Sequence, residues 1–576
     1  MAFSIERLTL LTFLPLWIIP GISIVYGVKE KLGLLVVWGD QPVAYIILGL
    51  FTNLLISLFF VFLPSPLDQI FRIAYLMIGF LWAVYQVVRA KPNVGLKVDR
   101  ILLALGVLLL FGQFYSSNQL IFPSFTDSIT HYRYIKHFLD WRDEGLSTWE
   151  FISQLRFYHY GFHLIATEIQ NLTGYAITDI MLTIGTWLIV LAPFTLALPL
   201  EQLGVTTENR RWAILLIGLV FVFPGFALNW GKYPAILSVV LLPMPLSLIL
   251  RIYKQPYKEK NWVRRLTSLV LFGLIGLSHW RSLVVLVTMT LVVMTFHKFL
   301  KKNIPIVVSG VLVLGALYFL VKDQGRFNVS GGQLVFWFLV LFVALIVLFV
   351  QFKRKKTTLL PLTIALYLAS RLLVEIPLGK LLPKIGAPVD MPYFRIVLFI
   401  IAGLFMGVLI SELKTLLLDR QEFLLTKKHF LKDIVVLVFV SLLIFAVPIH
   451  RKWTPANAYS LVGVQQKEVL DWALNTYKGQ NRKLLLAGTP LLDYVEYTDA
   501  GGWLAEMGEF DVVFAIDSVD LNRSGVHDRL CRENVSLVYA DYSRATVFSP
   551  KVMLDTNLYN TLFETEDVRL ISPRCD

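Results

Sequence analysis

Residues 43–63 read VAYIILGLFTNLLISLFFVFL and contain no charged side chain. An apolar stretch of about 18 or more residues can cross the hydrocarbon core of a bilayer as one helix. Comparable runs lie near 7–27, 43–63, 69–88, 100–117, 176–200, 211–229, 232–252, 264–279, 282–300, 303–322, 333–352, 357–377, 392–412 and 432–449. The sequence therefore predicts a mainly α fold, a polytopic transmembrane helix bundle of about 14 spans.

The composition agrees with this prediction. Of the 576 residues, 56% are hydrophobic and 16% are charged, whereas a soluble domain carries about 25% charged residues. One soluble core cannot bury this much apolar surface. A soluble globular protein, a disordered chain and a small disulfide scaffold are therefore excluded.

Charge divides the chain into two parts. Residues 451–576 hold 13 Lys and Arg against 18 Asp and Glu, whereas residues 1–450 hold 40 against 22. No basic stripe lies on a soluble face, so nucleic acid is not expected as a partner. The acidic tail is predicted to be a separate soluble unit.

Basic residues also predict the orientation of the spans. They gather in alternate connections, at Lys29 and Lys31, Arg89 to Arg100, Arg210 and Arg211, Arg251 to Arg265, Lys298 to Lys302, Lys353 to Lys356, and Lys414 to Lys432. Loops rich in Lys and Arg stay in the cytoplasm. A multi-pass membrane protein with both termini outside the cytoplasm follows. The outer face then receives the loop 118–175, the turns at 229–233 and 279–281, the loop 378–391 and the tail 450–576.

The tail is predicted to be an extracytoplasmic α/β domain. Residues 483–487, 511–516 and 536–540 resemble short buried strands, and residues 526–533 resemble a helix. The chain has two cysteines, Cys531 and Cys575. An oxidising compartment permits a disulfide between them; the alternative is two unrelated thiols.

The loop 118–175 holds the first candidate for chemistry. Asp127 and His131 are spaced i, i+4, which puts both on one face of a helix. Tyr134 and Phe138 continue that face, while Ile129 and Tyr132 begin an apolar stripe suited to a membrane interface. We expect Asp127 to act as a general base and His131 to orient it, bind phosphate or bind a metal. Alternatively, Asp127 is only a helix N-cap.

A second segment of this loop reads Tyr158-His159-Tyr160-Gly161-Phe162-His163. His159 and His163 could ligate a metal if the segment is helical. No further ligand stands at a diagnostic spacing, so interfacial packing of His and Tyr is the favoured interpretation. Tyr158, His159 and His163 remain candidates for substrate binding.

Basic side chains on the predicted outer face point to an anion. They are Lys232, His279, Arg281 and Arg395. Cations outside the cytoplasm run against the positive-inside bias, so we expect them to bind a phosphate or an anionic lipid headgroup. Arg371 is a further candidate for substrate binding, although it could instead form a structural i, i+4 pair with Glu375.

These motifs together resemble the GT-C superfamily of integral membrane glycosyltransferases, and most closely its family 39-like members. The resemblance rests on residues 125–132 and 158–163, the turns Gly231-Lys232-Tyr233-Pro234 and His279-Trp280-Arg281, and the tail segment 467–472. It covers much of residues 100–576. The domains it implies are additional N-terminal helices over 1–98, a GT-C-like catalytic module over 99–449 and a soluble domain over 450–576.

The resemblance implies an enzyme of a prokaryotic plasma membrane. Such an enzyme, of the inverting type, moves a sugar from a polyprenyl-phosphate donor to a hydroxyl of a glycan, lipid or protein, and Asp127 matches the family's catalytic Asp. The chain lacks the acidic pair of some relatives, so no cofactor is expected with certainty and a divalent metal is left open. A transporter or flippase of a lipid-linked or anionic substrate is the alternative, and a non-catalytic scaffold is a weaker one. A transporter should carry ionisable residues deep in several spans.

Overall fold

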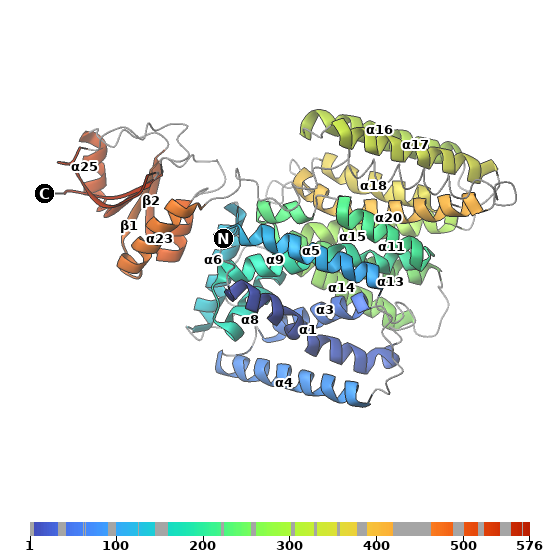
Figure 1. The fold of residues 1–576 in the computed structure, drawn as a ribbon, viewed down its shortest axis with the longest axis horizontal. Helices are drawn as coiled ribbons and strands as arrows, with labels where there is room; N and C mark the ends of the chain where they lie inside the picture. The colour runs from blue at the N-terminus through green and yellow to red at the C-terminus, as the bar shows by residue number, and fades with distance from the viewer. Residues whose placement is uncertain are drawn as a thin grey trace.

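The computed structural model contains a helix bundle and a smaller C-terminal domain (Figure 1). It describes residues 5–32, 42–60, 63, 65–89, 99–124, 126–143, 159–220, 224–254, 261–300, 306–327, 331–353, 358–376, 389–418, 462–487, 500–516, 524–541, 555–566 and 568–575. The expected span 432–449 and the candidate Tyr158 lie outside these residues. The described chain is mainly helical, as the sequence predicts.

The bundle begins with three helices from the segment that the sequence sets apart as additional. They are α1 (Ile5–Leu32), α3 (Pro42–Phe60) and α4 (Ser65–Arg89). Helix α1 contacts both α3 and α4, and it also contacts α9 of the following module. The N-terminal helices are therefore packed into the bundle.

The rest of the bundle is a long series of helices. In chain order these are α5 (Arg100–Asn118), α6 (Thr126–Asp143), α8 (Gly161–Thr173), α9 (Ile177–Thr195), α10 (Ala197–Gln202), α11 (Thr207–Val220), the 3-10 helix η1 (Gly225–Trp230), α12 (Tyr233–Leu241), α13 (Pro243–Lys254), α14 (Asn261–Ser278), α15 (Trp280–Leu300), α16 (Ile306–Phe327), α17 (Gly331–Lys353), α18 (Leu360–Glu375) and α20 (Met391–Leu418).

Six stretches of the described residues are long and apolar enough to cross a membrane. They are Ile5–Gly27, Pro42–Phe60, Arg100–Asn118, Ile177–Gln202, Tyr233–Tyr253 and Met391–Leu416. Four shorter apolar helices accompany them: Arg265–Ser278, Trp280–Phe296, Val308–Phe319 and Val340–Lys353. These helices indicate a membrane protein, while the full number of about 14 spans stays a prediction.

The predicted span 211–229 is one of those that fall on two helices in the structure. The run 211–229 divides into α11, which ends at Val220, and η1, which begins at Gly225. Pro224 supplies the reason for a new start, because proline has no backbone N–H to continue a helix. The break brings the chain to Gly231 and Lys232 in a tight turn rather than at the end of a continuous span.

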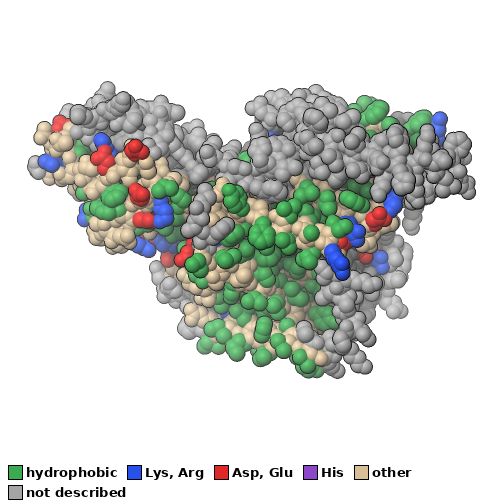
Figure 2. All heavy atoms as spheres, in the orientation of Figure 1, with side chains coloured by type: hydrophobic (Ala, Val, Ile, Leu, Met, Phe, Trp, Pro, Cys, Tyr) green, Lys and Arg blue, Asp and Glu red, His purple; other side chains and the backbone are tan. Residues whose placement is uncertain are grey.

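The outer surface of the bundle is apolar in the way a lipid-facing surface requires. Large side chains such as Ile70 and Val88 on α4 and Phe111 on α5 are more than 60% exposed. Figure 2 shows hydrophobic side chains gathered over this side of the molecule. Exposed apolar surface on this scale marks a face that contacts lipid or a partner.

The C-terminal domain is a five-stranded mixed sheet with helices. Its strands β1 (Lys483–Ala487), β2 (Asp511–Ile516), β3 (Leu537–Asp541), β4 (Tyr559–Glu564) and β5 (Val568–Pro573) lie in the order β2-β1-β3-β5-β4. Strand β1 pairs in parallel with β2 and β3, and β5 pairs antiparallel with β3 and β4. The helices are α23 (Val464–Tyr477), α24 (Ala500–Gly508) and α25 (Ser524–Arg532).

The predicted α/β character of this domain is confirmed. Strands β1 and β2 have the expected bounds, and β3 begins and ends one residue later than expected. Cys531 and Cys575 form the expected disulfide, with their Cα atoms 5.4 Å apart. Strand β4 was missed, because its pairing with β5 leaves much of it exposed and its sequence carries no apolar run.

Candidate functional site

A polar cavity of about 220 Å³ opens where five separate segments of the bundle meet. The segments are α6, the residues before α8, the turn before α12, the turn between α14 and α15, and the start of α20. The cavity is lined by Asp127, His131, His159, Lys232, Pro234, Ala235, His279, Trp280, Arg281, Asp390, Tyr393 and Ile396. Six of the residues singled out from the sequence are therefore brought together.

An ion pair between Asp127 and Lys232 forms one side of the cavity. The Lys232 ammonium donates to a carboxylate oxygen of Asp127. About a third of each side chain stays exposed. Asp127 is in the first turn of α6, where a carboxylate also interacts favourably with the helix dipole. This position does not depend on a capping hydrogen bond from the Asp127 side chain. The ion pair with Lys232 is the main contact that the structure describes for this carboxylate.

Gly231 makes this ion pair geometrically possible. It ends η1 with φ +61°, a left-handed conformation that favours glycine. A Cβ atom built there would lie 2.9 Å from the backbone nitrogen of Ser128 and 3.1 Å from the carbonyl oxygen of Ser124. The turn thus packs directly on the start of α6, which puts Lys232 beside Asp127.

His131 joins three segments of the site. Its Nδ1 atom lies 3.0 Å from Nε2 of His163 on α8, and the side chain is also hydrogen-bonded to the backbone of Gly231. The His131 ring is therefore held by one residue of α8 and by the turn that precedes α12. His131 is thus suited to holding α6, α8 and the Gly231 turn together, in addition to the orienting role that the sequence suggested.

Two further histidines, His159 and His279, line the cavity. The rings of His159 and His279 have their centroids 4.3 Å apart, and the ring of His279 stacks on Tyr393 at 4.5 Å with 3° between the planes. Gly161 permits this approach, because a Cβ there would lie 2.9 Å from Cα of Ser278. His159 precedes α8 and His163 lies within it, so the two do not form the helical i, i+4 metal pair considered from the sequence.

All four histidines are uncharged at neutral pH. Burial lowers the pKa of His159 to about 3, and the neighbouring His163 and the Arg281 charge lower it by smaller amounts. Burial likewise holds the pKa of His131, His163 and His279 well below the ordinary value. The rings therefore offer neutral hydrogen-bonding groups and leave the positive charge of the cavity to Lys232 and Arg281.

Asp390 is a cavity residue that the sequence analysis missed. Its carboxylate lies 2.5 Å from Nη1 of Arg281 and also accepts from the backbone N–H of Tyr393 at 2.8 Å. The second contact is an N-cap of α20. A signal was present, because an Asp directly before an apolar span that opens with Met391-Pro392 is a typical helix start.

Two of the expected cations do not line the cavity. Arg395 is not among its residues. Arg371 is fully buried, pairs with Glu375 at 2.9 Å and lies over the ring of Phe319 at 4.8 Å. Lys322 joins the same carboxylate at 3.0 Å. The i, i+4 ion pair between Arg371 and Glu375, which the sequence offered as the structural alternative, is therefore present.

No metal site is evident in the described part of the chain. There, no group of three or more His, Cys, Asp or Glu side chains is arranged to hold a metal ion. The histidines instead contact one another and the backbone.

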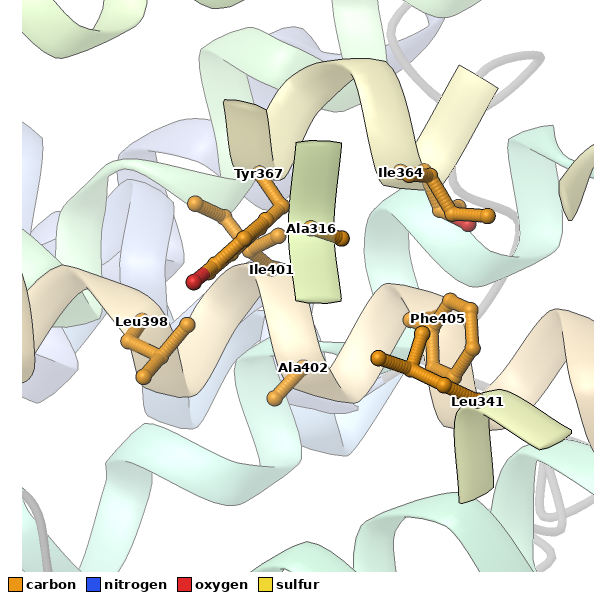
Figure 3. A pocket seen from close by; sticks show the side chains of 9 residues that line it. Ala316, Leu341, Ile364, Tyr367, Leu398, Ile401, Ala402 and Phe405 are labelled. Carbon is orange, nitrogen blue, oxygen red and sulfur yellow. The ribbon is translucent and has the colours of Figure 1, made fainter. Parts of the chain in front are cut away.

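An apolar pocket of about 70 Å³ lies beside the same helix, α20 (Figure 3). Its walls come from α16, α17, α18 and α20, and include Tyr367, Ile401 and Phe405. On α18, one helical turn after the pocket residue Tyr367, Arg371 lies over the rings of Phe319 and Phe394. An apolar pocket suits a hydrocarbon group of a ligand.

No protein-family model and no curated protein sequence matches this chain. The chemistry of the site therefore has to be argued from its own residues. The cavity combines a carboxylate at a helix start, two cations that are each paired with a carboxylate, and three neutral imidazoles. Such a set can take up an anion and accept a proton in the same space.

Proposed function

We propose that the protein is a membrane glycosyltransferase of the GT-C type. It moves a sugar from a polyprenyl-phosphate donor to a hydroxyl of a glycan, lipid or protein acceptor, with inversion. The observation that carries the proposal is the single cavity shared by Asp127, Lys232 and Arg281. One carboxylate supplies a base, and two cations suit a phosphate leaving group.

The proposed reaction uses these groups in a balanced way. The proton of the acceptor hydroxyl passes to Asp127, and the hydroxyl oxygen forms the new bond to the anomeric carbon. The bond from that carbon to the phosphate oxygen breaks, and its electron pair leaves on the polyprenyl phosphate. Negative charge grows on the phosphate in the transition state, so Lys232 and Arg281 stabilise that state more than the ground state.

The two ion pairs of the cavity give the donor a way to prepare the base. Lys232 is paired with Asp127 and Arg281 with Asp390. A bound phosphate competes for both cations. When Lys232 turns to the phosphate, Asp127 is released to accept the proton of the acceptor.

Other features support a lipid-linked donor and an external site. The apolar pocket along α20 has the chemistry for a hydrocarbon tail. The disulfide between Cys531 and Cys575 supports an oxidising compartment for the C-terminal domain. We accordingly propose about 14 spans, a prokaryotic plasma membrane, and both termini and the site outside the cytoplasm.

The test is sugar transfer from a labelled polyprenyl-phosphate donor by purified protein. Asp127→Asn should abolish transfer while donor binding persists, and Lys232→Met should weaken donor binding. Asp140→Asn is the matched control, because Asp140 lies exposed on the same helix and should keep activity. Near wild-type turnover by Asp127→Asn contradicts the general-base role.

A multi-pass transporter or flippase remains the second candidate because of one observation. Arg72 and Glu168 form a buried ion pair between α4 and α8, and ionisable residues inside a bundle are typical of transport pathways. Proteoliposomes that move the lipid-linked sugar across the bilayer, without transferring it to an acceptor, would favour this function.

A further inference from the structure

The helix that carries Asp127 has a second face, and the C-terminal domain covers it. Successive residues of an α-helix are rotated by about 100°. On α6, Asp127 and His131 therefore share one side with Tyr134 and Phe138. Ile129, Tyr132, Arg133 and Lys136 fall on the opposite side. The sequence predicted that the stripe beginning with Ile129 and Tyr132 lies in a membrane interface. In the structure these two residues pack against the C-terminal domain instead.

Trp503 of α24 is the centre of this contact. Its side chain is fully buried. Its ring lies 5.4 Å from that of Tyr132 and 5.3 Å from that of Phe122, measured between centroids. Ile129 belongs to the same hydrophobic cluster. A buried Trp with aromatic neighbours is the kind of anchor that dominates the energetics of an interface.

Two ion pairs fix the register of α24 on α6. Nε of Arg133 donates to Glu506 at 2.8 Å, and the Lys136 ammonium donates to Glu509 at 2.7 Å. Glu506 is on α24 and Glu509 directly follows its last residue, so the C-terminal end of α24 lies alongside α6. In Figure 1 α6 lies at the end of the bundle nearest the C-terminal domain. Burial of Tyr132 in this contact raises its pKa to about 12.

We propose that the C-terminal domain is a positioning element for α6 and, through α6, for Asp127. Trp503, Glu506 and Glu509 are the positioning residues. Among the described residues, α6 is not one of the candidate membrane spans, whereas α9 and α20 belong to such spans. It is held by His163 and Gly231 on the cavity side and by α24 on the other. Loss of the α24 contact frees the start of α6 and displaces the carboxylate from Lys232.

The catalytic part of this inference rests on the proposed function; the structural part does not. Charge reversal separates the two with little risk to the fold, because Arg133 and Glu506 lie at the edge of the interface with 36% and 16% of their side chains exposed. The variants are Glu506→Arg, Arg133→Glu and the double reversal. Asp471→Lys is the matched control, since it breaks an exposed ion pair inside the C-terminal domain.

Spin-label distances report the position of α6 without any assay of activity. Both native cysteines are in the disulfide, so labels attach only to introduced ones. Asp140→Cys with Asn475→Cys measures α6 against the C-terminal domain, and Asp140→Cys with Ala176→Cys measures α6 against the bundle. Each single reversal should broaden both distance distributions. The double reversal and the Asp471→Lys control should leave both narrow.

Transfer kinetics complete the test. Each single reversal should lower kcat by about tenfold to a hundredfold, the cost of a misplaced catalytic group, with little change in the donor KM. The double reversal should restore it. A broadened distance to the C-terminal domain with an unchanged distance to the bundle overturns the proposal, as does full activity in a single reversal. If no variant and no wild-type protein transfers sugar, the proposed function fails, while the two distances still decide whether the C-terminal domain positions α6.

Discussion

The guanidinium of Arg72 on α4 lies 3.2 Å from the carboxylate of Glu168 on α8, and both side chains are almost completely buried. Glu168 also accepts a hydrogen bond from Nε1 of Trp17 at 3.2 Å and one from the hydroxyl of Ser57. The carboxylate thus joins α1, α3 and α4 to the helix that carries His163. The N-terminal helices, which the sequence sets apart as additional, are therefore joined to α8 through one buried carboxylate.

Glu168→Gln should destabilise the bundle strongly. The amide still accepts from Trp17, but the charge of Arg72 is left buried without its counter-ion, which costs about 3–5 kcal/mol. Glu208→Gln is the control. Glu208 and Lys414 are exposed partners, and an ion pair in contact with solvent contributes little to stability. Thermal unfolding in one detergent compares the two, and equal losses would argue against a structural role for the buried pair.

Gly231→Ala should disrupt the site without removing any charged group. Alanine carries the cost of the left-handed backbone, about 1–2 kcal/mol, and its Cβ also meets the backbone of Ser128 at 2.9 Å. The turn must move, and Lys232 moves with it. Calorimetry should show weaker donor binding, and the loss of binding free energy should exceed the loss of unfolding free energy.

Gly174→Ala measures the cost of alanine in a left-handed backbone conformation without the cost of a steric clash. Gly174 ends α8 with φ +69°, and a Cβ there meets nothing within 4 Å. Its substitution should cost about the same 1–2 kcal/mol while donor binding stays unchanged. If both variants behaved alike, close packing of Gly231 on α6 would not be what sets the position of Lys232.

The parts of the structure that local patterns determine could be predicted from the sequence. Strands β1 and β2 are short apolar runs, and the structure gives them the predicted bounds. The common location of Asp127, Lys232, His279 and Arg281 followed from their place in the predicted topology. Arg395 also lies near the predicted outer end of a span but does not line the cavity. The position of a residue along a span does not determine the face of the helix on which its side chain lies.

Contacts between distant segments could not be predicted. The pairing of Lys232 with Asp127 depends on the left-handed turn at Gly231, and that of Arg281 with Asp390 joins residues 109 positions apart. The docking of Trp503 on Tyr132 joins two domains. Periodicity describes a helix face but does not say what covers it, so the apolar face of α6 was assigned to a membrane interface.

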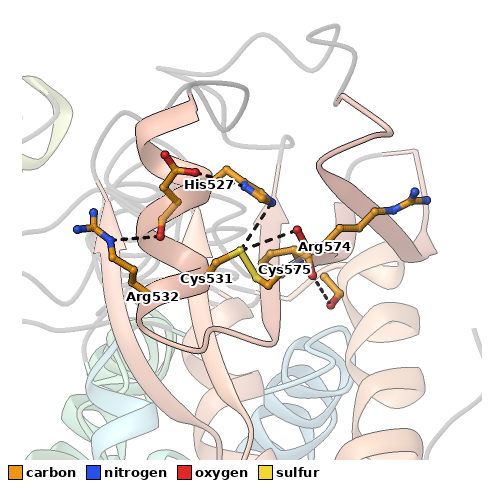
Figure 4. The surroundings of a disulfide bond; sticks show 8 residues. His527, Cys531, Arg532, Arg574 and Cys575 are labelled. Atoms are coloured by element: carbon orange, nitrogen blue, oxygen red, sulfur yellow. Dashed lines mark hydrogen bonds and ion pairs between the residues drawn. A yellow bond between two sulfur atoms is a disulfide. The ribbon is translucent and has the colours of Figure 1, made fainter.

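Removal of the disulfide should loosen the C-terminal end of the sheet. Cys531 and Cys575 connect α25 to the second residue after β5 (Figure 4). Their sequence separation of 44 corresponds to about 4 kcal/mol in the chain-entropy model. Cys531→Ser with Cys575→Ser should lower the free energy of unfolding of this domain by roughly that amount, seen as faster hydrogen exchange in β3 and β5. A reductant should reproduce the effect in the wild-type protein and add nothing in the double variant.

Acidification should destabilise the protein before its carboxylates are protonated. An unfolded His has a pKa of about 6.5, whereas burial lowers the pKa of His159 to about 3 and that of His131, His163 and His279 well below the ordinary value. Between these values the unfolded chain binds protons that the folded chain does not. Stability is therefore full above about pH 6.5 and falls as the pH drops, by up to about 1.4 kcal/mol per pH unit for each such histidine.

Thermal unfolding between pH 7.5 and 5 measures this loss, in a range where unfolded Asp and Glu, with pKa values of about 4, are still ionised. His159→Asn removes one of these four buried histidines and should reduce the slope of stability against pH by the share of one proton. Its stability at pH 7.5 reports the lost ring contact with His279 separately, because no protonation differs there. A slope that is flat in the wild-type protein, or unchanged in His159→Asn, would show that the cavity histidines take up protons in the folded state and that the cavity opens to water on acidification.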